Sequence, residues 1–173
     1  MNAARWFQRR EDYQPPKTPP ESPFRKFDVK FLACGSYQMR LRLESRSEAW
    51  RSIAFLLGHW QLRGYGMWAA EDKQTGEFVG RIGLHNPEGW PVFEVGWLID
   101  RARWGEGLAT EGGAAAMQFA FERLHRDHIS SVIQPKNNAS IRVAEKLGMK
   151  RESSTQIDGI DVVIYGRDRQ ASS

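Results

Sequence analysis

Residues 90–125 constrain the fold of this chain more than any other segment. Residues 90–99 are too apolar for an exposed edge strand and predict a strand in the middle of a sheet. A loop with glycines at positions 105 and 107 follows, and then small and apolar residues at helical spacing. Glycines separated by one residue let backbone N–H groups point to a common place, where a helix start adds further donors. The glycine loop (residues 104–111) therefore predicts an anion site or an ordinary strand-to-helix turn.

Glu94 is the exception in the apolar strand. A carboxylate in such a strand must find a partner, face a cavity or shift its pKa upward. In the helix that follows, residues 112–116 are all glycine or alanine, which allow close approach to the sheet or to a ligand. Glu94 and the start of this helix are therefore candidate functional elements.

Further helices and strands are predicted on both sides of this segment. Ser45 and Glu48 form a capping box, which predicts a helix that starts there and stops before Gly64. Its apolar stripe, expected to form one packing face, comprises Trp50, Ile53, Ala54, Leu57 and Trp60, with His59 expected in the core. Strands are predicted within residues 30–43, as an edge strand, and at residues 67–70, 77–84, 128–134, 149–155 and 161–165. Asn137 or Asn138 is predicted to cap a short helix that ends at Gly148.

The length of 173 residues indicates one domain. Residues 1–30 are rich in proline and charge and predict an extended or disordered tail, residues 31–166 form the predicted domain, and residues 167–173 are a polar tail. No apolar run approaches the roughly 20 residues that cross a bilayer. Residues 1–6 lack the apolar core of a secretory signal, so a cytoplasmic location is expected.

The net charge of +4 belongs to the front of the chain, where residues 1–51 carry eleven Lys and Arg against six Asp and Glu. Such a segment can contact nucleic acid or ribosomes, but no interleaved aromatic pattern supports that function. Cys34 is the single cysteine, which excludes an internal disulfide, a zinc cluster and a two-thiol redox site. His125 and His128 flank a turn and are expected to be solvated, and no metal site is predicted.

Three blocks of the sequence together resemble the GNAT superfamily of N-acetyltransferases, and the residues of these motifs resemble its RimJ/RimL-like branch. Residues 96–99 and 103–111 are similar to the strand and pyrophosphate loop of that branch, residues 137–149 to its second motif, and residues 68–84 with 89–91 to its front hairpin. The resemblance covers about residues 47–166. It implies an α/β (α+β) fold with a mixed, mostly antiparallel central sheet flanked by helices, and a cofactor cleft where two central strands splay apart.

The resemblance also implies acetyl-CoA as co-substrate. The backbone N–H groups of Gly105, Gly107 and Ala109 would hold the pyrophosphate, within a cofactor site that comprises Trp104, Gly105, Glu106, Gly107, Leu108, Ala109 and Thr110. Trp97, Leu98 and Ile99 would pair with the pantetheine arm and donate a backbone N–H to the thioester oxygen. Asn137 would bind the same arm.

The acceptor amine must lose a proton before it attacks, and Glu94 is the candidate base because an apolar strand raises its pKa. The alternative is a structural carboxylate paired with an arginine. Ser140 is the candidate proton donor to the departing thiolate, or else a helix cap or cofactor contact. The chain departs from the family pattern at Ala144, where many members have a tyrosine, and over residues 1–46, which match the first strand and helical lid of the branch poorly.

The predicted function is transfer of an acetyl group from acetyl-CoA to a primary amine, on a protein N-terminus or a small molecule, by direct attack in a ternary complex. A monomer or a homodimer is expected. Two alternatives remain open: a catalytically silent module that binds acyl-CoA, and a protein that docks on a ribosome or RNA through its basic N-terminal segment. The sequence does not select the acceptor, because the contacts that choose it lie in the front helix and loops.

Overall fold

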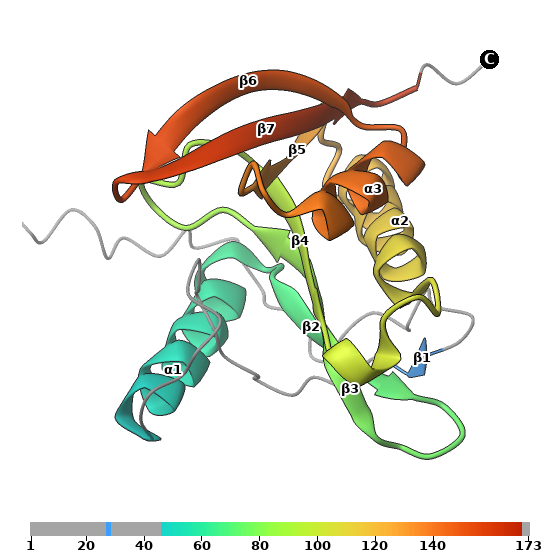
Figure 1. Ribbon diagram of the computed structural model, residues 1–173. Helices are drawn as coiled ribbons and strands as arrows, with labels where there is room; N and C mark the ends of the chain where they lie inside the picture. The colour runs from blue at the N-terminus through green and yellow to red at the C-terminus, as the bar shows by residue number, and fades with distance from the viewer. Residues whose placement is uncertain (1–26, 29–45, 171–173) are drawn as a thin grey trace, which may run out of the picture.

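One sheet organises the molecule. The computed structural model describes residues 27–28 and 46–170. Within them the strands β1 to β7 lie in the order β1-β2-β3-β4-β5-β7-β6 (Figure 1). Their bounds are β1 Phe27–Asp28, β2 Met67–Asp72, β3 Phe78–His85, β4 Glu94–Ile99, β5 His128–Ile133, β6 Lys150–Ile157 and β7 Ile160–Asp168. All pairs are antiparallel except β4 with β5, so the predicted mixed, mostly antiparallel sheet is confirmed.

Helices flank the sheet on both sides. They are α1 Arg46–Arg63, the short 3-10 helix η2 Arg101–Arg103, α2 Leu108–Glu122 and α3 Asn138–Lys146. In Figure 1 α2 and α3 lie to one side of the central strands and α1 lies to the other. The main core fills the space between α2, α3 and the sheet, where Ile82, Val95 and Ile129 are almost fully buried.

The glycines of α2 allow the close approach that the sequence predicts. A Cβ atom at Gly112 would collide with Ile82 of β3, and one at Gly113 would lie 2.8 Å from Leu147 Cδ1. A larger side chain at Gly112 would push the helix away from the sheet, and one at Gly113 would push it away from Leu147 at the end of α3. The small residues therefore fix the distances of α2 from the central strands and from α3.

The predicted packing face of α1 is wrong for most of its length. Trp50, Ile53 and Leu57 are 74%, 36% and 42% exposed within the described residues. The buried residues are Leu56, His59 and Trp60. The helix contacts the sheet through its C-terminal turns, and helical spacing alone does not say which turns of a helix find a neighbour. The expected burial of His59 is confirmed.

Element bounds otherwise follow the sequence closely. Strand β4 starts at Glu94 and not, as predicted from the sequence, at residue 90. The preceding residues contain a turn in which the Trp90 N–H donates to the Pro87 carbonyl at 3.1 Å. Strand β7 runs to Asp168, into the expected tail, and Arg167 donates to the Leu147 carbonyl at 2.7 Å. The predicted edge strand, the Ser45 cap and Cys34 lie outside the described residues, as does the proline-rich segment except for Phe27–Asp28, which forms β1 and pairs with β2. Among the described residues no helix is long and apolar enough to span a membrane.

Candidate functional site

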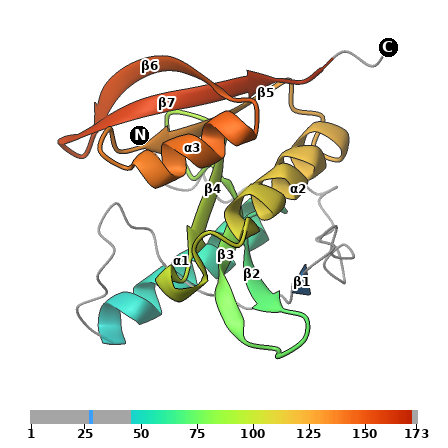
Figure 2. The same ribbon diagram turned by 45° about the vertical axis from the view of Figure 1, so that its right-hand side comes forward.

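Strands β4 and β5 part immediately after they meet. Strand β4 pairs with β3 along its whole length, from Gly80 with Ile99 to His85 with Glu94. Its register with β5 consists of Glu94 with Ser130 alone. Beyond this point β5 stays paired with β7, which pairs with β6, while β4 stays paired with β3 (Figures 1 and 2). The sheet therefore opens beyond Glu94, as expected from the predicted splay of two central strands.

The Glu94 carboxyl group lies at the apex of this opening. The Ser130 N–H donates to the Phe93 carbonyl at 2.9 Å, so a continuing parallel ladder would pair the Val132 N–H with the Val95 carbonyl. Val132 N–H donates to Glu94 Oε1 instead, at 3.3 Å. The carboxyl group thus replaces a backbone acceptor and lies between the two strands.

Desolvation makes the Glu94 carboxyl group an unusually weak acid. Desolvation raises the pKa of its carboxyl group to about 7, against the lowering effects of the Val132 N–H, the Trp90 indole and the Arg81 charge. The Trp90 Nε1–H donates to Oε2 at 2.8 Å. The upward shift predicted for a carboxylate in an apolar strand agrees with this environment. A carboxyl group with a pKa near neutrality can both accept and release a proton at physiological pH.

The edge of β4 beyond Glu94 offers backbone groups to a ligand. The Asp100 N–H donates to the Val79 carbonyl at 2.9 Å, which sets the alternation of hydrogen-bonded pairs between β3 and β4. By this alternation the backbone N–H and C=O groups of Leu98 point to β3, whereas those of Trp97 and Ile99 point to the gap between β4 and β5. The Ile99 carbonyl accepts the Trp104 Nε1–H at 2.9 Å. The Trp97 N–H and carbonyl and the Ile99 N–H therefore point into the opening.

The glycine loop lies at the far end of this edge and is anchored by its neighbours. Gly105 and Gly107 have φ angles of 90° and 83°, and Gly107 is the N-cap of α2. Arg103 donates to Asp72 Oδ2 at 2.8 Å and to Glu106 Oε1 at 2.8 Å. These ion pairs lower the pKa of both carboxyl groups. The Glu106 side chain is thus engaged with Arg103, and its backbone is what the loop offers to a ligand.

The remaining predicted cofactor residues lie in the first turns of α2 and α3. Leu108 is buried in the core, while Ala109 and Thr110 are half-buried. Asn137 is the cap of α3, since its Oδ1 accepts the Ser140 N–H at 3.1 Å. The Nδ2–H groups and the second lone pair of Oδ1 are left for a contact of Asn137 with pantetheine. Ser140 is half-buried in the first turn of α3.

A row of rings that the sequence analysis did not connect leads from Glu94 to α1. It consists of Trp90, His85 and His59. The Trp90 ring meets His85 edge to face at 5.2 Å, and His85 stacks on His59 at 5.6 Å. The His59 Nε2 accepts the Asn86 N–H, so its Nδ1–H is the donor to the Tyr65 carbonyl at 2.9 Å. If His59 were doubly protonated, its Nε2–H would face the Asn86 N–H. The spacing of a tryptophan four residues before Glu94 was the available signal for the Trp90 contact.

We expect this histidine pair to make the fold sensitive to acid. Burial, with the charges of His59 and Arg81, lowers the pKa of His85 from 6.5 to about 4. A lowered pKa stabilises the fold above pH 6.5, and this contribution is lost as the pH falls toward 4. As the pH falls from 6.5 toward 4, the free energy of unfolding of the His85→Phe variant should therefore decrease by about 2 to 3 kcal/mol less than that of the wild type. Denaturant unfolding at pH 7.5 and pH 4.5 measures the difference, and equal losses would contradict it.

Comparison with known proteins assigns the family. Residues 25–150 match the acetyltransferase (GNAT) domain, which is well over half of the chain. The chain belongs to the GNAT acetyltransferase family. The membership predicted from the three sequence blocks is thereby confirmed, and the glycine loop and the splayed strands lie within the matched region.

Individual relatives agree with this assignment. The Bacillus subtilis (strain 168) protein YkkB, itself uncharacterised, is 38% identical over 109 residues, which are 61% of this chain and 63% of YkkB. An acetyltransferase from Agrobacterium tumefaciens str. C58 has a similar structure, with a TM-score of 0.75, 24% identity, and coverage of 93% and 99% of the two chains. Mycobacterium smegmatis RimJ, solved with a CoA-disulfide, gives a TM-score of 0.61 at 21% identity and covers 78% of this chain and 68% of RimJ.

These relatives differ in what they establish. At 24% and 21% identity the two solved structures show a shared fold. The chain spans less than two thirds of the length of the curated relatives that it matches first, 63% in the case of YkkB. Within the described residues no group of three or more His, Cys, Asp or Glu side chains is arranged to hold a metal ion.

Proposed function

We propose that this chain transfers an acetyl group from acetyl-CoA to a primary amine by direct attack in a ternary complex. The observation that carries the proposal is the position of the Glu94 carboxyl group. It is bound to the Val132 N–H at the apex of the β4–β5 opening, next to the exposed backbone edge of β4. An amine that enters this opening would meet a base and an acyl-binding edge together.

The residues present fit acetyl-CoA. Positive φ angles at Gly105 and Gly107 turn the loop backbone, and beyond the chain neighbours no protein atom lies within 4 Å of a Cβ built at either glycine. The first N–H groups of α2 follow directly, and such groups bind pyrophosphate. The pantetheine arm would pair with the edge of β4 at Trp97 and Ile99, in the manner of a further strand. The bound CoA-disulfide of Mycobacterium smegmatis RimJ supports this choice of ligand.

The chemistry follows from these positions. The protonated amine gives a proton to the Glu94 carboxylate, and its nitrogen forms a bond to the thioester carbon. The C–S bond then breaks, the nitrogen loses its second proton, and the thiolate takes up one. Ser140 remains the candidate donor, which would give its hydroxyl proton to the thiolate and take up the proton that leaves the nitrogen. A backbone N–H of the β4 edge, such as that of Trp97, would stabilise the oxygen that becomes negative, typically by about 3 kcal/mol. Ala144 stands where many family members have a tyrosine, which assigns the donor role to another group.

Release of free thiol in the presence of a panel of amines and peptides tests this function. We expect release to depend on both acetyl-CoA and an amine, and the best acceptor identifies the substrate class. Tight acetyl-CoA binding with no release for any amine would instead support a silent acyl-CoA-binding module. Docking on RNA through residues 1–30 predicts that deletion of this segment abolishes a salt-sensitive association.

The rate should rise with pH through the pKa of Glu94. Below about pH 7 the carboxyl group is protonated and cannot accept the proton of the amine. We expect kcat/KM to fall about tenfold per pH unit below this value. The Trp90→Phe variant removes a hydrogen bond to the charged form and should move the midpoint to higher pH. A pH profile without this inflection, or a midpoint that Trp90→Phe leaves in place, would contradict the role of Glu94.

A further inference from the structure

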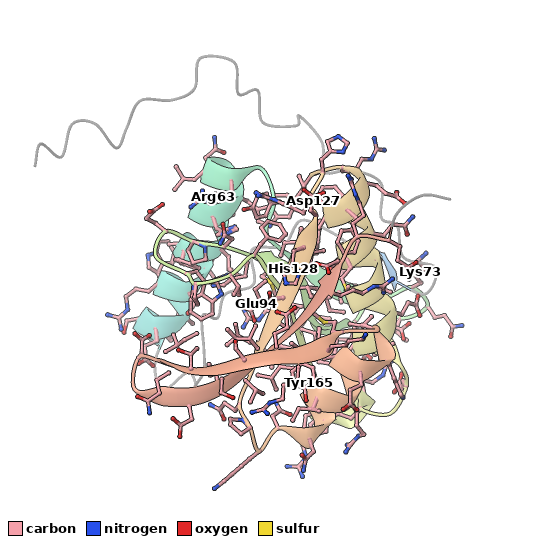
Figure 3. The ribbon with its side chains drawn as sticks, turned by 90° about the horizontal axis from the view of Figure 1, so that it is seen from above. Arg63, Lys73, Glu94, Asp127, His128 and Tyr165 are labelled. Atoms are coloured by element: carbon pink, nitrogen blue, oxygen red, sulfur yellow. The ribbon has the colours of Figure 1, made fainter. Side chains whose placement is uncertain are left out.

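A patch of sheet without side chains lies beside the Glu94 carboxyl group. Gly83 of β3 and Gly96 of β4 are register partners, and we call this pair the bare patch. Outside residues 95–97, the atoms nearest to a Cβ built at Gly96 would be Glu94 Oε1 and Met67 Cε, both at 3.8 Å. Figure 3 shows Glu94 near the centre of the molecule. The space over Gly96 is thus bounded by the proposed base and by an apolar methyl group.

Arg81 lies at the other end of the bare patch. Every second residue of a strand points to the same face of the sheet, so Arg81 shares a face with His85, four residues farther along β3. His85 stacks on His59 of α1, which identifies this face as the one toward α1. Along this face the paired residues of β3 and β4 are, in order, His85 with Glu94, Gly83 with Gly96, and Arg81 with Leu98.

The charge of Arg81 acts on the groups at the opposite end of the patch. Desolvation raises the pKa of Glu94, and the Arg81 charge opposes this rise. Desolvation also lowers the pKa of His85 to about 4, with smaller effects of His59 and Arg81, so the His85 ring is neutral at pH 7. Arg81 is half-buried, and a guanidinium in such a place attracts an anion more strongly than one in bulk water.

The order of these groups fits one kind of acceptor. A protonated amine over Gly96 would face Glu94 Oε1, and the side chains of Met67 and Leu98 offer apolar surface to a short alkyl segment. The Arg81–Leu98 pair lies two residues beyond the bare patch, which is roughly 6.8 Å along the strands. An arginine binds a carboxylate through two parallel N–H···O bonds. The spacing suits an amine and a carboxylate that are separated by a few carbon atoms.

We propose that the acceptor of this chain is a primary amine that also carries a carboxylate, with the amine at Glu94 and the carboxylate on the Arg81 guanidinium. This inference rests on the proposed function, because it names the acceptor class of the same reaction. In this arrangement Arg81 contacts neither the thioester nor the reacting nitrogen. Its removal should therefore raise the KM for the acceptor more than it lowers kcat.

The first test compares acceptors with and without a carboxylate on the wild-type protein. Glycine, β-alanine and 4-aminobutyrate are each paired with the corresponding amide, and amine-dependent thiol release is measured at pH 9, above the pKa of about 7 of Glu94. We expect the best carboxylate to exceed its amide at least about tenfold in kcat/KM, because hydrogen bonds to a charged group are strong. An amide that is used as well as its carboxylate in every pair would overturn the inference.

The second test removes the guanidinium and compares proteins for each acceptor, so that differences in amine basicity cancel. Arg81→Gln should raise the KM for the carboxylate acceptor at least about tenfold, and leave kcat/KM for the amide and the Kd for acetyl-CoA within about twofold. Arg81→Lys keeps the charge but not the paired donors, and should lie between the two. The pH midpoint should rise in Arg81→Gln for both acceptors, because the charge that lowers the pKa of Glu94 is lost.

Arg63→Gln is the control for loss of an arginine. Arg63 lies at the end of α1, away from Glu94 in Figure 3, and pairs with Glu88 at 3.3 Å on the surface. This variant should match the wild type with every acceptor. Equal losses for carboxylate and amide in Arg81→Gln would make Arg81 a structural residue and overturn the inference.

The outcomes also separate this inference from the proposed function. Thiol release that depends on amines but shows no preference for a carboxylate overturns the acceptor class and leaves acetyl transfer standing. No release with any amine overturns both. The comparison on the wild type decides the acceptor class even where an Arg81 variant does not fold.

Discussion

Glu94→Gln is expected to lower kcat by about 10² to 10⁴-fold and to leave the Kd for acetyl-CoA within about twofold, because a positioned base typically contributes a factor of this size. The glutamine keeps the size of the side chain and an oxygen for one of the two donors, Trp90 Nε1–H and Val132 N–H. It removes the capacity to accept a proton. Stopped assays of free thiol give kcat, and titration calorimetry with acetyl-CoA gives the Kd.

This substitution also has a structural cost that must be measured separately. A glutamine side chain has one acceptor oxygen for two donors, and an unsatisfied buried donor costs about 1 to 3 kcal/mol. Denaturant unfolding should register this loss. Glu71→Gln is the control, since it makes the same change at another glutamate of the sheet, on β2, which is buried at 5% exposed. If Glu94→Gln retains wild-type kcat, the carboxyl group is structural and another group must deprotonate the amine.

The elements around the site were predictable because each depends on local sequence. The alternating and continuous apolar runs gave β2 to β5 within a few residues, and the glycine pair gave the loop before α2. The raised pKa of Glu94 followed from one carboxylate in an apolar strand. These inferences need only neighbours along the chain, which the sequence states directly.

What failed depended on contacts between distant segments. Helical spacing predicted a packing face on α1 that is largely exposed at Trp50, Ile53 and Leu57. His128 is exposed, as expected, but its partners Glu152 and Asp168 on β6 and β7 were not predicted. Such pairs form only when register and a bulge bring separate strands together, and no local pattern encodes them. The insertion of Glu94 between β4 and β5 is of the same kind.

Gly107→Val should weaken acetyl-CoA binding by at least about 100-fold. Gly107 has a φ of 83°, a region that a β-branched residue adopts only with strain, and it is the N-cap of α2. Relief of that strain turns the N–H groups of the loop away from a common point. Loss of two N–H contacts to pyrophosphate costs about 3 kcal/mol or more, because hydrogen bonds to charged groups contribute about 1.5 to 3 kcal/mol each. Calorimetric titration with acetyl-CoA measures the change.

A second glycine separates loss of the ligand site from general backbone strain. Gly159, in the turn between β6 and β7, has a φ of 75° and, like Gly107, no protein atom other than its chain neighbours within 4 Å of a Cβ built there. Gly159→Val should therefore destabilise the fold by a similar amount and leave acetyl-CoA affinity unchanged. Equal weakening of binding by both variants would indicate an indirect effect of strain. Wild-type affinity in a folded Gly107→Val protein would mean that the pyrophosphate lies elsewhere, and the assignment of the glycine loop would be wrong.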